Sequence, residues 1–237
     1  MICDNETGQC IITPVNGTSD ALSPRGNEES IAVHYVGDPM CSWCWGMSDA
    51  LKALETWCQA RGFQFVLTNG GLRAGGGDEW NAAFRNFLRN EWQHINTVTG
   101  QPFNYSLLEL DDFNYDTEPA CRAVVSASII RPDAKMAFFR ETQKKFYTES
   151  ADPKETDFYR SVCDVTGIDY VEFSEVFEAK FSSLETYNEF NLVRQFGVNA
   201  FPTVLVQKSG AIRKVASGYL NEDDLIKKVS EAEAQMF

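Results

Sequence analysis

The sequence predicts an α/β fold in which a strand-helix-strand unit and a strand-strand-helix unit enclose an all-helical block. Three observations predict it. An apolar run at residues 31–36 leads into Cys41 and Cys44, and a helical pattern of apolar residues follows at once. Helix-type periodicity fills residues 78–196, and strand-type patterns return at residues 202–217. The chain has 237 residues, of which 43% are hydrophobic, enough for one large domain or for one domain that carries a sizeable insertion.

The first predicted unit is a strand, a long helix and a second strand. Residues 31–36 form the first strand. The helix buries a stripe with spacings of three and four residues, at Cys44, Met47, Leu51, Leu54 and Cys58. It ends near Arg61-Gly62, because glycine commonly stops a helix, and residues 63–67 form the second strand. Strands joined by a helix in this way are expected to run parallel.

A helical block follows a glycine-rich break at residues 69–77. Its first helix has one amphipathic face, formed by Trp80, Phe84, Phe87, Leu88, Trp92 and Ile95. Capping residues and prolines predict the starts of the later helices, at Thr117-Glu118-Pro119, after Pro132, at Pro153, at Asp169 and at Leu184.

The chain closes with sheet signals and a last helix. Residues 202–206 and 211–217 form a hairpin pattern around Ser209-Gly210, and Asn221 caps the final helix. Residues before 29 are polar and rich in turn formers, so they are expected to form an arm outside the core. The predicted segments are an arm at 1–28, a first α/β part at 29–74, a helical insertion at 75–196 and a second α/β part at 197–237.

Composition limits the partners. The net charge is −13 and no basic cluster is present, so neither nucleic acid nor an anionic membrane surface is an expected partner. The first residues lack the basic and apolar regions of a secretory signal, and no apolar run approaches the ~18 residues of a membrane span. A cytoplasmic protein with reduced thiols is therefore predicted. No feature of the sequence specifies an oligomeric state.

The pair Cys41 and Cys44 carries the predicted chemistry. Cys41 stands at the start of a helix, where unpaired amides and the helix dipole favour a thiolate. Disulfide exchange needs an exposed thiol of low pKa that attacks and a shielded thiol that resolves the mixed disulfide. Cys41 is expected to be the exposed nucleophile, and Cys44, one turn inward, the resolving thiol.

The cysteines allow two other uses. A zinc site needs four ligands, but Cys3 and Cys10 are the only other close thiol pair and the chain has two histidines, so no metal site is expected. Cys3 and Cys10 could close a small loop, form a second exchange pair or be spare thiols. A small loop or spare thiols are favoured over a second exchange pair, because nothing near them in sequence would activate them.

Four stretches carry a resemblance to a known family, namely Asp38 to Gly46, Asn69 to Arg73, Glu118 to Ala123 and Phe196 to Thr203. On these the chain resembles the DsbA family of the thioredoxin superfamily, in its FrnE-like branch of predicted protein disulfide isomerases. The resemblance implies a thioredoxin fold with an all-helical insertion. It covers the chain from about residue 30 onward and gives no account of Cys3 and Cys10.

The resemblance also implies roles for residues around the dithiol. Pro202 would follow a cis peptide bond and face the cysteines, with the preceding backbone free to pair with a bound peptide. Phe201 would then be a substrate-facing platform, and three further residues would join it in substrate binding: Met40, Trp43 and Trp45. His34 would replace the buried acid beneath the dithiol and take the proton of Cys44; the alternative is an ordinary core histidine.

Three functions follow. The leading one is an enzyme, a thiol–disulfide oxidoreductase or protein disulfide isomerase that acts on protein or small-molecule disulfides. It would bind no cofactor and use glutathione or a dithiol reductant as redox partner. The second is a glutathione-dependent transferase or isomerase of the kappa-class or 2-hydroxychromene-2-carboxylate isomerase type, against which the resolving thiol Cys44 argues. The third is a chaperone-like surface formed by the aromatic residues near the dithiol.

Overall fold

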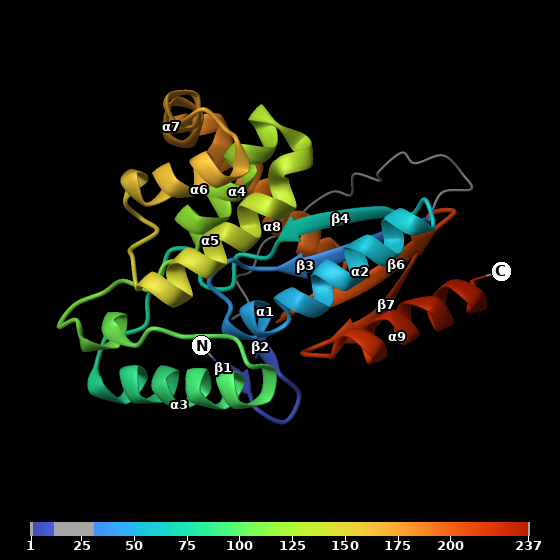
Figure 1. The fold of residues 1–237 in the computed structure, drawn as a ribbon, viewed down its shortest axis with the longest axis horizontal. Coiled ribbons are helices and arrows are strands. Elements are labelled where there is room, and N and C mark those ends of the chain that lie inside the picture. The colour runs from blue at the N-terminus through green and yellow to red at the C-terminus, as the bar shows by residue number, and fades with distance from the viewer. Residues whose placement is uncertain (1, 12–30, 237) are drawn as a thin grey trace.

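The α/β part of the molecule is built on a four-stranded sheet (Figure 1). The computed structural model describes residues 2–11 and 31–236. In sheet order the strands are β4 (Gln64–Asn69), β3 (Ile31–Gly37), β6 (Thr203–Lys208) and β7 (Ala211–Ser217). The pair β3 and β4 is parallel, whereas β3–β6 and β6–β7 are antiparallel.

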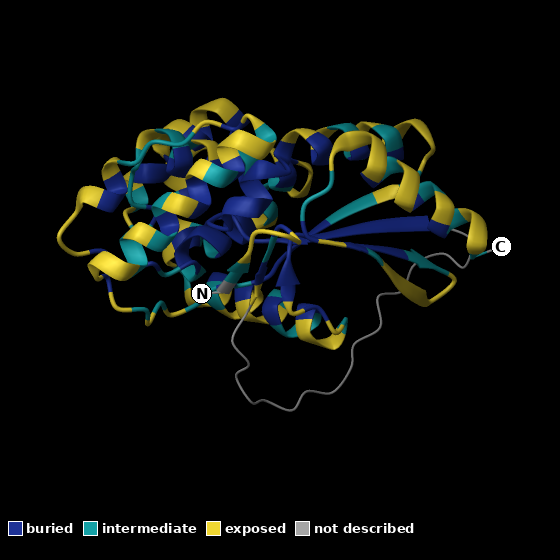
Figure 2. Ribbon diagram, turned by 90° about the horizontal axis from the view of Figure 1, so that it is seen from below, coloured by how far each residue is buried: buried dark blue, intermediate teal, exposed yellow. Residues whose placement is uncertain are grey.

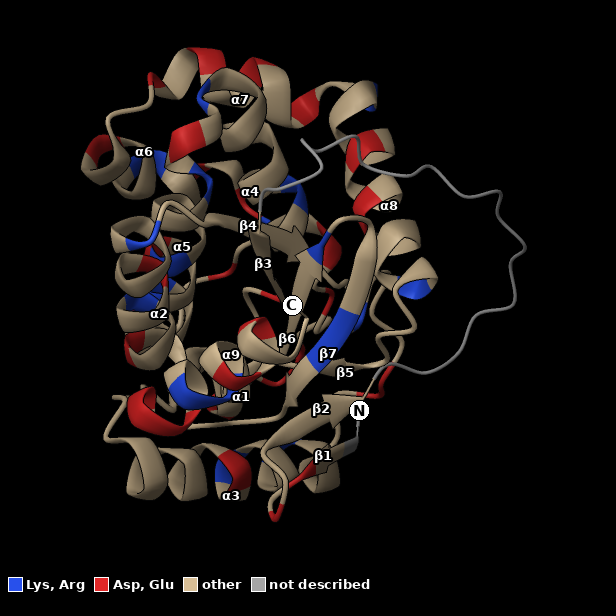
Figure 3. Ribbon diagram, turned by 90° about the vertical axis from the view of Figure 1, so that its right-hand side faces the viewer, with Lys and Arg blue, Asp and Glu red and all other residues tan. Residues whose placement is uncertain are grey.

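Helices cover both faces of this sheet. On one face lie α2 (Ser48–Ala60) and α9 (Glu222–Gln235), and α8 (Lys180–Gln195) lies on the other (Figure 3). Because β3 is central and covered on both sides, all seven of its residues are buried. This explains why residues 31–36 form a continuous apolar run rather than an alternating one.

Local sequence signals define the second half of the sheet. Ser209 (φ 48°) and Gly210 (φ 79°) both have left-handed backbones, which suits the tight two-residue turn between β6 and β7. The Asn221 side chain accepts a hydrogen bond from the backbone N–H of Asp224 at 2.9 Å and caps α9.

An all-helical block is inserted between β4 and β5 (Ala200–Phe201). Its longer helices are α3 (Ala82–Thr99), α4 (Glu118–Ile130), α5 (Lys135–Glu149), α6 (Arg160–Thr166), α7 (Tyr170–Glu178) and α8. Short 3-10 turns stand at Ser106–Glu109, Pro132–Ala134 and Thr156–Tyr159. Figure 2 shows the buried interior running from these helices into the sheet. The predicted fold class, an α/β thioredoxin fold with a helical insertion, is confirmed; the segment boundaries predicted above stay a prediction.

A second sheet lies beside the first and was not predicted. β1 (Ile2–Asp4) and β2 (Gln9–Ile11) form a hairpin, and β2 pairs antiparallel with β5. The prediction of an arm outside the core was wrong for residues 2–11. β2 pairs with β5, which ends directly before Pro202, and Cys10 of β2 is fully buried. The rest of the predicted arm, residues 12–28, lies outside the described residues.

Charged residues are distributed over much of the described surface. Acidic residues are spread over several helices, including α8 and α9, while Arg213 and Lys214 stand together on β7 (Figure 3). Across residues 2–11 and 31–236, no helix is both long and apolar enough to cross a membrane.

Candidate active site

Cys41 is the N-cap residue of α1 (Ser42–Gly46), directly after the loop that leaves β3. Its backbone is extended, with φ −84° and ψ 115°. Its sulfur accepts a hydrogen bond from the backbone N–H of Cys44 at 3.4 Å. Its own N–H donates to the carbonyl of Asp38 at 3.0 Å. The strand-to-helix turn therefore holds the first sulfur against the amide of the second cysteine, at the positive end of a helix.

Both sulfurs of this pair are buried, each cysteine being 0% exposed. The expectation of an exposed Cys41 with a low pKa was wrong for this structure. Burial raises the pKa of Cys41 well above its ordinary value, and the neighbouring thiols of Cys10 and Cys44 raise it further. Part of the cover comes from the hairpin β1–β2, which carries Cys10.

Cys10 is the unexpected neighbour of the dithiol. It is 0% exposed and shares one buried cluster with Cys41 and Cys44. Burial raises the pKa of Cys10, but hydrogen bonds from Cys3, from Cys41 and from the Trp43 amide outweigh it and lower that pKa well below its usual range. The sulfur of Cys10 thus lies between the sulfurs of Cys3 and Cys41 and bonds to both.

Phe201 and Pro202 lie next to the same cluster. The peptide bond between them is cis, the isomer that the family resemblance implies. The Phe201 ring is fully buried and packs against Gly70, where an added Cβ would stand only 2.0 Å from the Phe201 Cζ. In β5, Phe201 is the register partner of Cys10. The hairpin therefore occupies the backbone edge that the resemblance assigns to a bound peptide.

Asp38 ties the active-site loop to the rest of the chain. Its carboxylate accepts hydrogen bonds from the Met40 amide at 2.8 Å and the Leu72 amide at 2.7 Å, and the Cys121 thiol lies 3.5 Å from it. The side chain is fully buried, and burial raises its pKa to about 6. Asp38 thereby joins three of the stretches that carry the family resemblance.

His34 and Tyr35 are the titratable residues of β3. The Nε2 atom of His34 lies 2.8 Å from Oε1 of Gln207, and its ring packs edge-on against Phe196. Burial lowers the pKa of His34, and the bond to Gln207 partly offsets this. The phenol of Tyr35 is fully buried and lies close to Cys44, where burial and that thiol raise its pKa well above the usual range. Among the described residues, Tyr35 rather than His34 is thus the neighbour of the resolving thiol.

The described residues contain no group of three or more His, Cys, Asp or Glu side chains arranged to hold a metal ion. The chemistry that the arrangement supports directly is exchange among sulfurs.

Comparison with solved structures identifies the fold. The structure is similar to a "putative protein disulfide isomerase" from Nitrosomonas europaea, at a TM-score of 0.78 and 28% identity, over 87% of this chain and 99% of that one. It is also similar to the cytosolic disulfide reductase DsbM from Pseudomonas aeruginosa, at a TM-score of 0.70 and 23% identity, over 87% of this chain and 100% of that one. The chain has the DsbA-like fold, and these matches support a place among the DsbA-like proteins.

More distant matches share the DsbA-like fold. The oxidoreductase NmDsbA1 from N. meningitidis has a TM-score of 0.56 at 9% identity, over 97% of this chain and 91% of that one. A 2-hydroxychromene-2-carboxylate isomerase matches at a TM-score of 0.56 and 13% identity, over 86% of this chain and 95% of that one. No family model and no curated protein matches the sequence.

The structure of this DsbA-like chain buries every residue expected to bind substrate. Met40 is fully buried and its carbonyl accepts from the Tyr115 hydroxyl at 2.8 Å. Trp45 is 6% exposed, stacks on Tyr147 and donates from Nε1 to the Pro102 carbonyl at 3.0 Å. These contacts direct the Trp45 side chain into the helical insertion and bind the Met40 backbone to Tyr115 of the same insertion. The expectation that these residues form an exposed surface was wrong, and their role in substrate binding stays a prediction.

Trp43 is buried for a different reason. It is 2% exposed, and its ring lies beside Tyr219 and His94, with Gly8 of the hairpin close by. The hairpin therefore covers both Trp43 and Phe201, the two predicted platform residues nearest the sulfurs. A peptide could reach them only if residues 2–11 moved.

The sequence analysis gave no role to two residues of this site, Tyr35 and Asp38, and did not place Cys3 and Cys10 beside Cys41. Asp38 could have been found, because it stands inside the stretch that carries the resemblance and an acid directly before a proline favours a turn. The position of Cys10 has no local signal, since it depends on strand pairing between residues about 190 apart.

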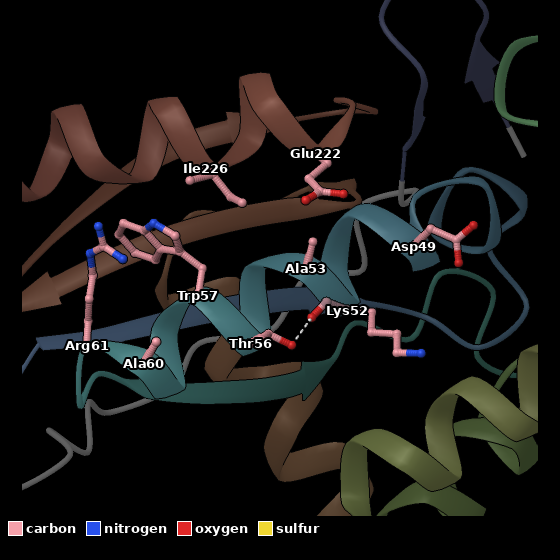
Figure 4. A pocket seen from close by; sticks show the side chains of 9 residues that line it. All are labelled: Asp49, Lys52, Ala53, Thr56, Trp57, Ala60, Arg61, Glu222 and Ile226. Carbon is pink, nitrogen blue, oxygen red and sulfur yellow. Dashed lines mark hydrogen bonds between the residues drawn. The ribbon is translucent and has the colours of Figure 1, made fainter.

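A shallow groove elsewhere on the DsbA-like fold is not part of this site. It has a volume of about 520 Å³ and lies between α2 and α9 (Figure 4). Its lining includes Trp57, with the Arg61 guanidinium 4.0 Å from the ring centroid, but no cysteine.

Proposed function

We propose that the chain is a thiol–disulfide oxidoreductase in which Cys41 attacks a disulfide of a protein or small molecule and Cys44 resolves the product. The observation that carries the proposal is the hydrogen bond from the Cys44 amide to the Cys41 sulfur at the start of α1. That contact places both sulfurs within one helical turn and favours the Cys41 thiolate whenever the site opens.

The exchange balances in two steps. The Cys41 thiolate attacks one sulfur of the substrate disulfide, and the other substrate sulfur leaves as a thiolate. Cys44 then loses its proton and attacks the Cys41 sulfur, which breaks the mixed disulfide and forms the Cys41–Cys44 disulfide. Two electrons pass from the enzyme to the substrate. The reverse sequence oxidises a substrate dithiol, so the same residues serve reduction, oxidation and isomerisation.

Glutathione is the proposed redox partner. DsbM, a relative of the same fold, has been solved with GSH and is described as a cytosolic disulfide reductase. A small thiol can reduce the Cys41–Cys44 disulfide by the two steps above in reverse order. Membership of the FrnE-like branch belongs to the same proposal and is supported by the motif stretches described above. Cytoplasmic localisation also belongs to it and is supported by the likeness to DsbM, which is cytosolic.

The glutathione-dependent transferase or isomerase remains the competing function. A transferase of that type needs one nucleophile and no second thiol. Cys44 is fully buried, and its amide bonds to the Cys41 sulfur, so the chain keeps a resolving thiol in position. This observation favours the oxidoreductase.

Reduction of insulin by glutathione tests the proposal. We expect the purified chain to accelerate the reaction and Cys41→Ser to abolish the acceleration. Cys44→Ala should accumulate a covalent, thiol-sensitive complex with insulin, because the mixed disulfide cannot be resolved. Cys163→Ser, which removes a buried thiol of the helical insertion, is the matched control and should retain activity. Full activity of Cys44→Ala on a small glutathione-dependent substrate, with no trapped complex, would contradict the proposal and favour the transferase.

A further inference from the structure

The hairpin β1–β2 brings a second pair of cysteines to the dithiol. Cys3 and Cys10 are direct register partners in this hairpin. Residues opposite each other in an antiparallel pair have Cα atoms about 4.5–5.5 Å apart, inside the range of about 4.4–6.8 Å that a disulfide spans. The backbone therefore already holds Cys3 and Cys10 at a spacing that suits a disulfide.

The same hairpin places Cys10 against the nucleophile. β2 pairs with β5 so that Cys10 stands opposite Phe201, directly before Pro202. The sulfur of Cys10 is within hydrogen-bonding reach of both Cys3 and Cys41, it shares one buried cluster with Cys41 and Cys44, and the Cys44 amide donates to the Cys41 sulfur. The four cysteines form one continuous path, Cys3 to Cys10 to Cys41 to Cys44.

Backbone contacts hold the hairpin against the end of β7. The Tyr219 amide donates to the Gly8 carbonyl at 3.1 Å, and the Gln9 side chain donates to the Ser217 carbonyl at 3.0 Å. Gly218 has a left-handed backbone (φ 94°), and an added Cβ there would lie 1.9 Å from the Thr7 carbonyl oxygen. The hairpin and the end of β7 thus meet backbone to backbone.

Exposure differs along the path of sulfurs. Cys10, Cys41 and Cys44 are each 0% exposed, whereas Cys3 is half-buried. While the hairpin is docked, Cys3 is therefore the sulfur of the four that an external thiol reaches most easily.

We propose that Cys3 and Cys10 form a second redox-active pair, which passes electrons to Cys41 and Cys44 within the same chain. This inference deepens the proposed function and rests on it. The hairpin then acts as an internal substrate seated on the edge of β5, and a small thiol of the glutathione class is its external reductant.

The transfer balances without any other reactant. The Cys10 thiolate attacks the Cys41 sulfur of the Cys41–Cys44 disulfide, and Cys44 leaves as a thiolate and takes up a proton. Cys3 loses its proton and attacks the Cys10 sulfur, and Cys41 leaves as a thiolate. Two electrons have moved, the Cys41–Cys44 pair is reduced and a Cys3–Cys10 disulfide has formed. Two molecules of the small thiol then reduce that disulfide and leave as their own disulfide.

A trapping experiment on the full chain tests the first step. The double variant Cys3→Ser, Cys44→Ser removes both leaving and resolving thiols and keeps Cys10 and Cys41. Trypsin cleaves after Arg25 and Lys52, so a Cys10–Cys41 disulfide links peptide 1–25 to peptide 26–52. In a glutathione redox buffer we expect this linked peptide in non-reduced digests. The double variant Cys10→Ser, Cys44→Ser is the matched control, and it should give no link because Cys3 stands one sulfur further from Cys41.

A rate measurement tests the whole transfer. Reduction of the Cys41–Cys44 disulfide by glutathione should slow roughly tenfold or more in Cys3→Ser and in Cys10→Ser, because the internal path is lost. Cys58→Ser, a buried cysteine on α2, should leave the rate unchanged. Absence of the linked peptide would overturn the inference, as would an unchanged or faster reduction in Cys10→Ser. In either case a Cys41–Cys44 disulfide that still forms in the wild-type chain leaves the proposed function intact.

Discussion

The carboxylate of Asp38 accepts a hydrogen bond from the Leu72 amide at 2.7 Å, although 34 residues separate them. The bond joins the loop before the dithiol to the loop after β4. A buried carboxylate at this junction makes the stability of the fold depend on pH.

The first prediction concerns the pKa of Asp38, which burial raises from 3.8 to about 6. Between these values the unfolded chain has lost the proton and the folded chain has kept it. The contribution of this group to the free energy of unfolding is therefore fully present below about pH 3.8 and decreases as pH rises. By the time the pH exceeds about 6, the loss amounts to on the order of 3 kcal/mol. Urea unfolding of the wild type and Asp38→Asn between about pH 4 and about pH 7 measures the effect. The stability advantage of the wild type should shrink with pH; a constant difference would contradict the assignment.

A second prediction concerns the docking of the hairpin. Gly8 has a left-handed backbone (φ 63°), and an added Cβ would lie 2.7 Å from the Tyr219 Cβ. Gly8→Ala should therefore displace residues 2–11, expose Cys41 and lower its raised pKa. We expect alkylation of Cys41 by iodoacetamide at neutral pH to accelerate by roughly tenfold or more.

Gly62→Ala is the control for this variant. Gly62 has nearly the same backbone (φ 69°), but an added Cβ there meets nothing within 4 Å. It imposes comparable backbone strain without a clash. Equal alkylation rates in the two variants would show that the hairpin does not shield Cys41.

A third prediction separates Tyr35 from His34. Tyr35 lies beside Cys44, whereas His34 bonds to Gln207. Tyr35→Phe should change the pH profile of the resolving step, because it removes the hydroxyl next to the attacking sulfur. His34→Gln, which keeps a buried polar group, should leave that profile in place. Stopped-flow decay of the mixed disulfide with a small model substrate measures both, and a shifted profile in His34→Gln alone would restore the predicted catalytic role of His34.

A fourth prediction concerns the contact between Phe201 and Gly70. Gly70→Ala inserts a methyl group 2.0 Å from the Phe201 Cζ, so the ring and β5 must shift. Overpacking of this kind costs about 1–3 kcal/mol of folding stability. Thermal unfolding measures the cost. A variant as stable as the wild type would show that the ring does not pack against this glycine.

Local patterns predicted the α/β part well. The apolar run at residues 31–36 and the cap at Asn221 each specify their element through neighbouring residues alone. Such signals depend only on residues that are close together in the sequence, so the sequence alone is enough to recognise them. The stripe from Cys44 to Cys58 predicted one helix, where the structure has α1 and α2 with Met47 between them.

The covered state of the site could not be predicted in this way. Whether Cys41 is exposed depends on β2, and β2 joins β5 from the opposite end of the chain. The sequence alone favoured a loop-closing or spare thiol at Cys10, because the groups that bond to it, Cys41 and the Trp43 amide, are neighbours in space only. Strand pairing over such a separation depends on tertiary packing rather than on local propensity.

The central claim is that Cys41 and Cys44 form a working dithiol, and a redox titration tests it most directly. The full chain is equilibrated in glutathione buffers of graded potential, and tryptophan fluorescence is read, since Trp43 and Trp45 flank Cys44. The account predicts a reversible two-electron transition that Cys41→Ser abolishes. A Cys3→Ser, Cys10→Ser variant removes the hairpin pair and should retain the transition. The absence of any reversible transition in both the wild type and this variant would contradict the account.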